Sequence, residues 1–132
     1  LLTLAGNGSA EEGTGVSVHL YVCNAGMTGR AFCTSDGEML FVPQLGVLRL
    51  ITEFGVMQVP PGHVALVPRG CRFRVDVDRP SRGYALENHG AAFRLPDLGP
   101  IGSNGLAAAR DFQTPDAATE ADTPTQLVMK LG

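Results

Sequence analysis

The chain of 132 residues is long enough for one domain with a packed core and too short for two. Hydrophobic residues make up 44% of it and charged residues 17%, with a net charge of −3. These values argue against a disordered chain and against a basic surface for nucleic acid or anionic membrane. No apolar run approaches the roughly 20 residues of a membrane span. The 17 glycines and 9 prolines between short apolar runs favour an all-β chain with tight turns.

The first strand is predicted at residues 16–22, where apolar and polar residues alternate. A half-buried strand turns its apolar side inward, so Leu20 and Val22 are expected on the buried face and His19 on the polar face. The glycine-rich stretches at residues 6–8 and 13–15 before this strand are interpreted as turns or loops.

The middle of the chain is a series of short strands separated by turn residues. Residues 47–59 read as a hairpin around Gly55, and Pro43 is expected to end the strand before it. The clearest alternation places Cys71 and Phe73 on one apolar face. The expected strands are residues 39–42, 47–52, 56–59, 64–67, 71–77 and 84–87, with turns or loops at 35–38, 59–62, 68–70 and 78–83.

The pattern changes after residue 94. Residues 95–105 read LPDLGPIGSNG, which predicts a fixed but irregular connection, and residues 117–125 are polar and expected to be a loop. Residues 106–112 have room for one helical turn, and residues 125–132 read as a strand. About seven or eight short strands with turns at this spacing indicate a sandwich or barrel.

The cysteines indicate a cellular compartment, and the two ends of the chain indicate that it is part of a longer protein. Cys23, Cys33 and Cys71 are odd in number and form no CxxC pair, so buried free thiols in a reducing cytoplasm are expected. The apolar residues 1–4 have no basic residue before them and are a poor signal peptide. Because the chain opens and closes on strand-like sequence, it is expected to be an excerpt of a longer protein.

One spacing resembles the second motif of the cupins, PG-x5-P-x-G-x2-H. Pro61 and Gly62 are followed by five residues, then by Pro68 and Gly70, and two residues later by Phe73. Pro-Gly bends the chain between strands, the five residues form one strand, and Pro-x-Gly makes the next turn. The last position then points into the barrel, where cupins place a metal-binding histidine.

The residues at the expected ligand positions cannot bind a metal ion. Phe73 has no donor atom. The first cupin motif resembles G-x5-H-x-H, and here Gly37 is followed by Pro43 and Leu45 at the two histidine positions. The sequence therefore predicts an incomplete cupin-like jelly roll or β-sandwich whose interior is filled by apolar side chains. A chance coincidence of turn residues is the alternative.

The histidines and cysteines give no strong sign of chemistry. His19, His63 and His89 share no motif such as HxH or HExxH, and surface or structural roles are favoured over a metal site. No base is paired in sequence with Cys33 or Cys71, and core packing is the better interpretation of Cys71.

The acidic and basic residues also give no strong sign of catalytic chemistry. No close carboxylate pair stands out among Glu38, Glu53, Glu87 and Asp97. Glu87 lies on a predicted strand where it could face a pocket, but a solvated or ion-paired role is favoured. Arg72 and Arg74 project from one strand face and are expected to pair with carboxylates of a neighbouring strand or subunit.

Four stretches resemble homogentisate dioxygenases and together cover most of the chain in the family's order. The most specific is LPDLGPIGSNGLA, which lies within RGYALENHGAAFRLPDLGPIGSNGLAAARDF at residues 82–112. The other stretches are residues 18–46, residues 52–77 and, similar to the bacterial form, TPTQLVMKLG at residues 123–132.

The resemblance implies an enzyme that opens the ring of homogentisate with O2, giving maleylacetoacetate in tyrosine and phenylalanine breakdown. It implies non-haem Fe(II) held by two His and one Glu, a further His as base, and a hexamer built as a dimer of trimers. The iron ligands belong to the carboxy-terminal portion of the family. No residue of this chain matches them, so no catalytic, cofactor-binding or metal role is carried over.

The resemblance also divides the chain. Residues 1–94 are expected to be the cupin-like part of the amino-terminal domain, and residues 95–132 an irregular linker and the start of a further strand region. The linker is predicted to fix one domain against the other. An aspartate at position 116, where the family is more apolar, is expected to weaken packing of the linker on the sandwich. The family's linker motif comprises Asp97, Gly99, Pro100, Gly102, Asn104 and Gly105.

Two other functions remain open from the residues alone. A metal-free cupin module that binds a sugar or another small ligand predicts a complete barrel with an open polar pocket. A small metallo-cupin enzyme would use His19, His63 or His89 and would carry bound metal after purification.

Overall fold

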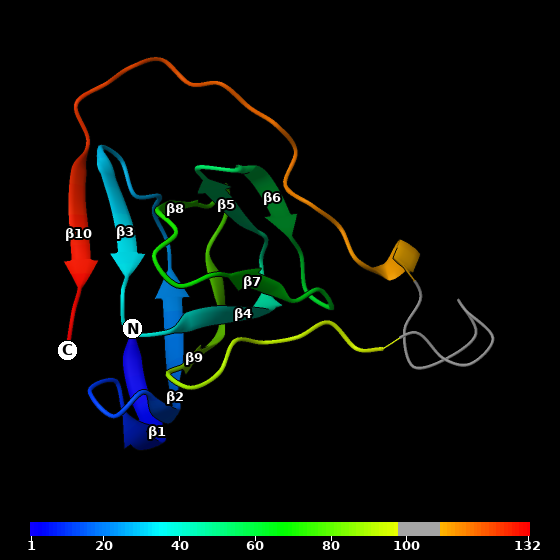
Figure 1. Ribbon diagram of the computed structural model, residues 1–132. Coiled ribbons are helices and arrows are strands. Elements are labelled where there is room, and N and C mark those ends of the chain that lie inside the picture. The colour runs from blue at the N-terminus through cyan, green and yellow to red at the C-terminus, as the bar shows by residue number, and fades with distance from the viewer. Residues whose placement is uncertain (98–108) are drawn as a thin grey trace.

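The computed structural model describes residues 1–97 and 109–132, and in this part of the chain ten strands form two sheets. The strands are Leu2–Ser9 (β1), Thr14–Cys23 (β2), Arg30–Thr34 (β3), Glu38–Leu45 (β4), Leu48–Thr52 (β5), Gly55–Val59 (β6), Ala65–Val67 (β7), Phe73–Asp76 (β8), Ser81–Asn88 (β9) and Gln126–Lys130 (β10). One sheet has the order β1-β2-β9-β4-β7 and the other β10-β3-β8-β5-β6. The sheets lie face to face (Figure 1), which confirms the predicted all-β sandwich.

The core lies between the two sheets and consists of side chains that point inward from strands of both sheets. Phe73 is at its centre, and its ring makes edge-to-face contacts with Phe32 and Phe41, each at a centroid distance of 5.6 Å. Cys71 and Cys33 are buried free thiols, as predicted, whereas Cys23 is half-buried. The buried core residues are Tyr21, Met39, Phe41, Leu48, Leu50, Val59, Ala65, Val67, Cys71, Phe73 and Ala85.

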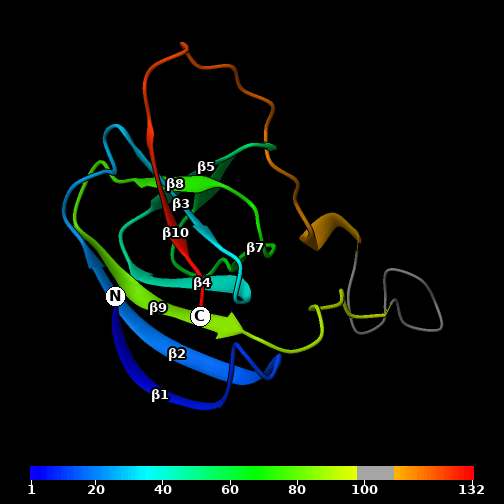
Figure 2. The same ribbon diagram turned by 60° about the vertical axis from the view of Figure 1, so that its left-hand side comes forward.

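Strand β10 returns to the sandwich after a long excursion. It pairs in parallel with β3, from Gln126 opposite Arg30 to Lys130 opposite Thr34, and forms one edge of the second sheet (Figure 2). On the way the chain passes a short 3₁₀ helix, Ala109–Asp111, and pairs its backbone at Asp116 with Val56 through two hydrogen bonds of 2.8 and 2.9 Å. The main chain of Asp116 makes this contact, and the expected weakening by its side chain stays a prediction.

The buried face of the first predicted strand is the opposite of the expected one. His19 and Tyr21 are buried, whereas Leu20 and Val22 are exposed, the latter to 81%. The strand faces a core that contains polar groups, and its apolar side carries no cover in the described structure. Period-two alternation thus located the strand but assigned the wrong side to the interior.

At two places, residues that were expected to interrupt or end a strand lie inside one. Residues 6–8 belong to β1, where Gly8 faces Gly15 of β2, and a Cβ on Gly8 would lie 2.2 Å from the carbonyl oxygen of Thr14. Pro43 lies inside β4, where the pairing with β9 shifts register before Leu45. The pairing of β4 with the short β7 ends at Phe41, so the missing N–H of Pro43 removes no hydrogen bond to β7.

One strand boundary and one whole strand were also missed. Strand β9 begins at Ser81, inside the predicted loop, and β3 was not predicted because its five residues, RAFCT, show no alternation. Within the described residues, no helix has the length and apolar character needed to cross a membrane.

Candidate functional site

The turns of the cupin-like motif are formed as the spacing requires. Gly62 and Gly70 have φ values of 89° and 79°, the left-handed region that glycine adopts most easily. Gly37 serves a different need, because a Cβ there would lie 2.4 Å from the carbonyl oxygen of Asn88. These turns place Phe73 in the core with 4% exposure.

The positions that hold metal ligands in cupins do not fit a metal ion in this chain. Pro43 is buried on β4, and Leu45 is 53% exposed after the register shift and does not face the interior. Phe73 faces the interior but offers no donor atom. Among residues 1–97 and 109–132 there is no cluster of three or more His, Cys, Asp or Glu side chains placed to hold a metal ion.

One end of the interior is charged, which corrects the expectation of a wholly apolar filling. Glu87 of β9 is 1% exposed and accepts hydrogen bonds from Thr34 Oγ1 and from Lys130 Nζ, both at 2.8 Å. The same Nζ lies 2.8 Å from Asp36 Oδ2, and Asp36 Oδ1 accepts a 2.8 Å hydrogen bond from the backbone N–H of Gly132. One lysine from β10 therefore pairs with two buried carboxylates, and we call Asp36, Glu87 and Lys130 the charge cluster.

The pKa values follow from these contacts. Burial alone would raise the pKa of Glu87, but the hydrogen bonds from Lys130 and Thr34 outweigh it, so the pKa lies below its usual value. The pKa of Asp36 is lowered in the same way, against burial, by Lys130 and the Gly132 N–H. Burial would lower the pKa of Lys130, yet the two carboxylates raise it. All three groups are therefore charged near neutral pH.

Two of the three histidines lie beside the charge cluster. His19 Nε2 is 3.5 Å from Glu87 Oε2, and its Nδ1 is 3.0 Å from the hydroxyl of Thr3. His89 is buried, with Nε2 3.0 Å from the Ser17 hydroxyl, while its Nδ1 has no hydrogen-bond partner among the described residues. His63 is exposed in its turn. His19 and His89 thus make hydrogen bonds in the interior, and the absence of a metal role for the three histidines stays a prediction.

The other half of the interior contains an apolar cavity of about 260 Å³. Phe32, Phe41 and Phe73 form one part of its wall, and Tyr21 is the lining residue that carries a hydroxyl group. The pKa of Tyr21 is raised, mainly by burial. The remaining lining residues are Leu1, Cys23, Met27, Met39, Leu48 and Val75.

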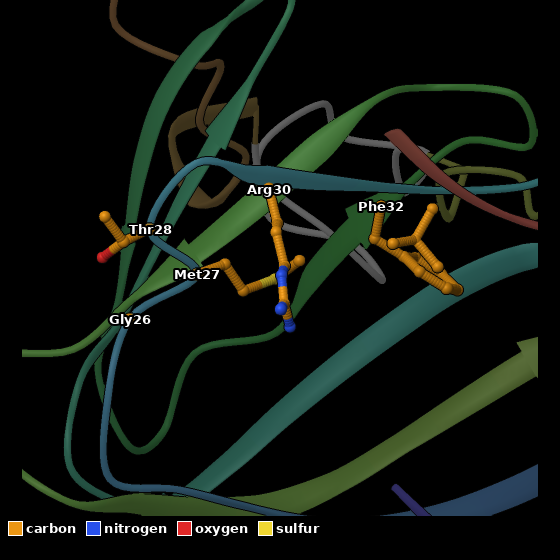
Figure 3. A pocket seen from close by; sticks show the side chains of 6 residues that line it. Gly26, Met27, Thr28, Arg30 and Phe32 are labelled. Atoms are coloured by element: carbon orange, nitrogen blue, oxygen red, sulfur yellow. The ribbon is translucent and has the colours of Figure 1, made fainter. Parts of the chain in front are cut away.

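A second hollow of about 400 Å³ adjoins this cavity and shares Met27 and Phe32 with it. Figure 3 shows Arg30 and Phe32 projecting to the same side of β3, with the guanidinium of Arg30 reaching toward Met27. Gly26, Thr28 and Val128 of β10 complete the wall. Arg30 is exposed, and it is the charged residue among those that line this hollow.

The structure brings together residues that no pattern in the sequence connects. Glu87 is ion-paired, as favoured, but its partners Lys130 and Asp36 were not singled out, because 43 and 51 residues separate them from it. Of the linker motif, Asp97 is exposed, and the other members, Gly99, Pro100, Gly102, Asn104 and Gly105, lie outside the described residues. The two arginines do pair with carboxylates, but these lie in a turn and in a loop rather than in a neighbouring strand: Arg72 pairs with Glu53, and Arg74 with Glu120.

Comparison with solved structures supports the fold. A cupin superfamily protein from Desulfitobacterium hafniense matches with a TM-score of 0.54 and 14% identity, over 66% of this chain and 73% of that one. A protein described as a putative mannose-6-phosphate isomerase from Ralstonia eutropha matches with a TM-score of 0.54 and 20% identity, over 68% and 82%. At these identities the likeness concerns the fold alone, and it is a cupin fold.

Comparison of sequences identifies the family. The family described as homogentisate 1,2-dioxygenase N-terminal matches residues 1–131. A homogentisate 1,2-dioxygenase from Rhodopseudomonas palustris (strain BisB18) is 52% identical, over 98% of this chain and 30% of its own length. The chain thus spans about a third of the length of that relative. It belongs to the family of homogentisate 1,2-dioxygenase amino-terminal regions.

Proposed function

We propose that the chain is a structural segment of a ring-cleaving non-haem Fe(II) dioxygenase, which converts homogentisate and O2 to maleylacetoacetate in tyrosine and phenylalanine catabolism. The segment builds the sandwich and contributes no catalytic residue. The observation that carries this is the filling of the interior: Pro43 and Phe73 occupy buried cupin positions, and the charged groups there are ion-paired with one another.

The remaining parts of the proposal follow from the family. Fe(II) supplies the redox chemistry and is bound by residues outside this chain, in a carboxy-terminal domain. The protein works in the cytoplasm, in keeping with the free thiols of Cys23, Cys33 and Cys71. Further partners are copies of the same chain in a trimer or hexamer, supported by exposed apolar residues such as Val22 on the uncovered face of β2.

The experiment uses the complete reading frame that contains this sequence. We expect the purified protein, supplied with Fe(II), to consume O2 with homogentisate and to form maleylacetoacetate. The variants Glu87→Gln and His19→Gln are expected to keep the iron content and the kcat/KM per bound iron, while their melting temperatures fall. Glu53→Gln, which changes an exposed carboxylate, is the matched control.

Two results would contradict this function. Absence of ring cleavage by the iron-loaded complete protein refutes the parent activity. Loss of iron or of kcat in folded Glu87→Gln protein, with an unchanged melting temperature, refutes the purely structural role of the segment.

The linker has a separate test. We propose that the motif around Asp97 and Asn104 fixes this domain against the next one, as its composition suggests. Replacement of either residue by Ala is expected to weaken the oligomer or the activity. An unchanged hexamer with full activity in both variants would rule the role out.

A further inference from the structure

We propose that the outer side of the sheet β1-β2-β9-β4-β7 is a contact surface for a second copy of this chain, packed face to face across a two-fold axis. The proposal rests on the proposed function in one respect, because that function includes association of copies. It names the surface that two copies share and the symmetry of their contact.

The outer side of this sheet is apolar across its strands. Because His19 and Tyr21 of β2 point inward, the residues that alternate with them point outward. Directly opposite residues of paired strands share a side of the sheet. Two adjacent outward rows cross the sheet: Leu2, Leu20, Tyr84 and Val42 in one, and Ala5, Val18, Leu86, Leu40 and Leu66 in the other. We call these residues, together with Val22, the outer face.

The outer face has the size of one half of a stable interface. Leu2 and Val22 are 63% and 81% exposed, and Tyr84 adds an exposed aromatic ring. Strands about 4.8 Å apart with a rise of about 3.3 Å per residue give such a sheet a projected area on the order of 500 Å². Protruding side chains bring the accessible area toward the roughly 800 Å² that each partner buries in a stable complex. Free proteins rarely leave a contiguous apolar patch of this size in water.

The charges at the two ends of the strands fit a copy of the same face. Arg82, opposite Val22, lies at one end, and Glu38, opposite Asn88, lies at the other, where its carboxylate accepts a hydrogen bond from the N–H of Phe93. A two-fold axis in the contact plane, perpendicular to the strands, reverses these ends. Apolar rows then meet apolar rows, while each Arg82 lies over the acidic end of the other copy and the two arginines stay apart. In a hexamer of two trimers, a two-fold contact is the kind that joins the trimers.

The first test uses the complete protein with the photo-crosslinking residue p-benzoylphenylalanine in place of Val22. We expect irradiation to give a covalent dimer on a denaturing gel, and mass spectrometry to find the cross-link on the outer face of the second copy. The same residue in place of Phe54 is the control, because Phe54 is exposed in the turn between β5 and β6 of the other sheet. It is expected to give no dimer at this face.

The second test is Val22→Lys, which enters a two-fold contact twice, once from each copy. Burial of an unpaired charge should raise the dissociation constant about 100-fold or more, measured by analytical ultracentrifugation. Phe54→Lys should leave the assembly unchanged. Because Val22 is exposed within one copy, equal urea midpoints of the dissociated subunits will show that the variant is folded.

Three results would overturn the proposal. A cross-link from position 22 within one chain would mean that the rest of the polypeptide covers the outer face, and a cross-link to a different protein would name another partner. Undiminished assembly of folded Val22→Lys would remove the contact itself. Ring cleavage is measured separately: an inactive protein that still forms the dimer refutes the parent activity alone, and an active protein without the dimer refutes the surface alone.

Discussion

Replacement of Lys130 by Met removes one positive charge from between two buried carboxylates while keeping most of the side-chain volume. The side chains of Glu87 and Asp36 are 2% and 3% exposed, so they cannot be rehydrated without local opening. Breaking a buried ion pair by removing one partner costs about 3–5 kcal/mol. Two features reduce this figure: Lys130 itself is 40% exposed, and each carboxylate keeps another donor, from Thr34 or from the Gly132 N–H.

We therefore expect Lys130→Met to lower the free energy of local opening of β10 and β3 by about 2–3 kcal/mol. At 1.36 kcal/mol per tenfold change, this corresponds to a loss of amide-exchange protection of about 30- to 160-fold. Hydrogen exchange followed by mass spectrometry measures it in the complete protein. The control is Arg72→Met, which breaks the exposed pair with Glu53 and is expected to cost less than about 1 kcal/mol.

The triple variant Lys130→Met, Asp36→Asn, Glu87→Gln separates charge from packing. It leaves no uncompensated charge, so most of the lost protection should return. Exchange in Lys130→Met that matches the unmodified protein would refute the reasoning. A triple variant as unprotected as the single one would show that the lysine stem, rather than its charge, holds β10 in place.

Three further predictions concern pH, packing and thiols. The pKa values of Glu87 and Asp36 are lowered in the folded state, so the stability that these carboxylates contribute is fully present above their unfolded-state pKa values, about 4.3 and 3.9. The urea concentration at half-unfolding should therefore fall as the pH drops through the folded-state pKa values. A urea midpoint that does not change over this range would contradict the prediction. Phe73→Ala should destabilise by about 3–5 kcal/mol in the same unfolding assay, since it removes both edge-to-face contacts; a loss below 1 kcal/mol would mean that the enlarged cavity collapses. Cys71 should react with a thiol reagent more slowly than Cys23, because burial raises its pKa and hides it, and equal rates by mass spectrometry would argue otherwise.

Local patterns predicted the features that depend on neighbours in sequence. The alternation at residues 71–77 placed Phe73 and Cys71 inside correctly, and the Pro-Gly turns were found from residue type alone. The inward face of β2 was missed, because hydrophobicity cannot distinguish a core contact from an uncovered apolar surface, as Val22 illustrates. The charge cluster was missed for a related reason. Its members meet only after β10 has paired with β3, and nothing near Lys130 in sequence signals a carboxylate partner.

The late arrival of β10 has a consequence for biosynthesis. Strand β9 ends at Asn88 and β10 begins at Gln126, so the second sheet gains its outer strand only after the intervening segment has left the ribosome. Until then Glu87 and Asp36 have no cation, and the nascent sandwich carries two acidic groups in a partly closed interior. Non-local pairing of this kind slows folding. Co-translational pairing of the charge cluster therefore waits for β10, and chains released before Lys130 is synthesised should be preferred substrates for chaperones and proteases.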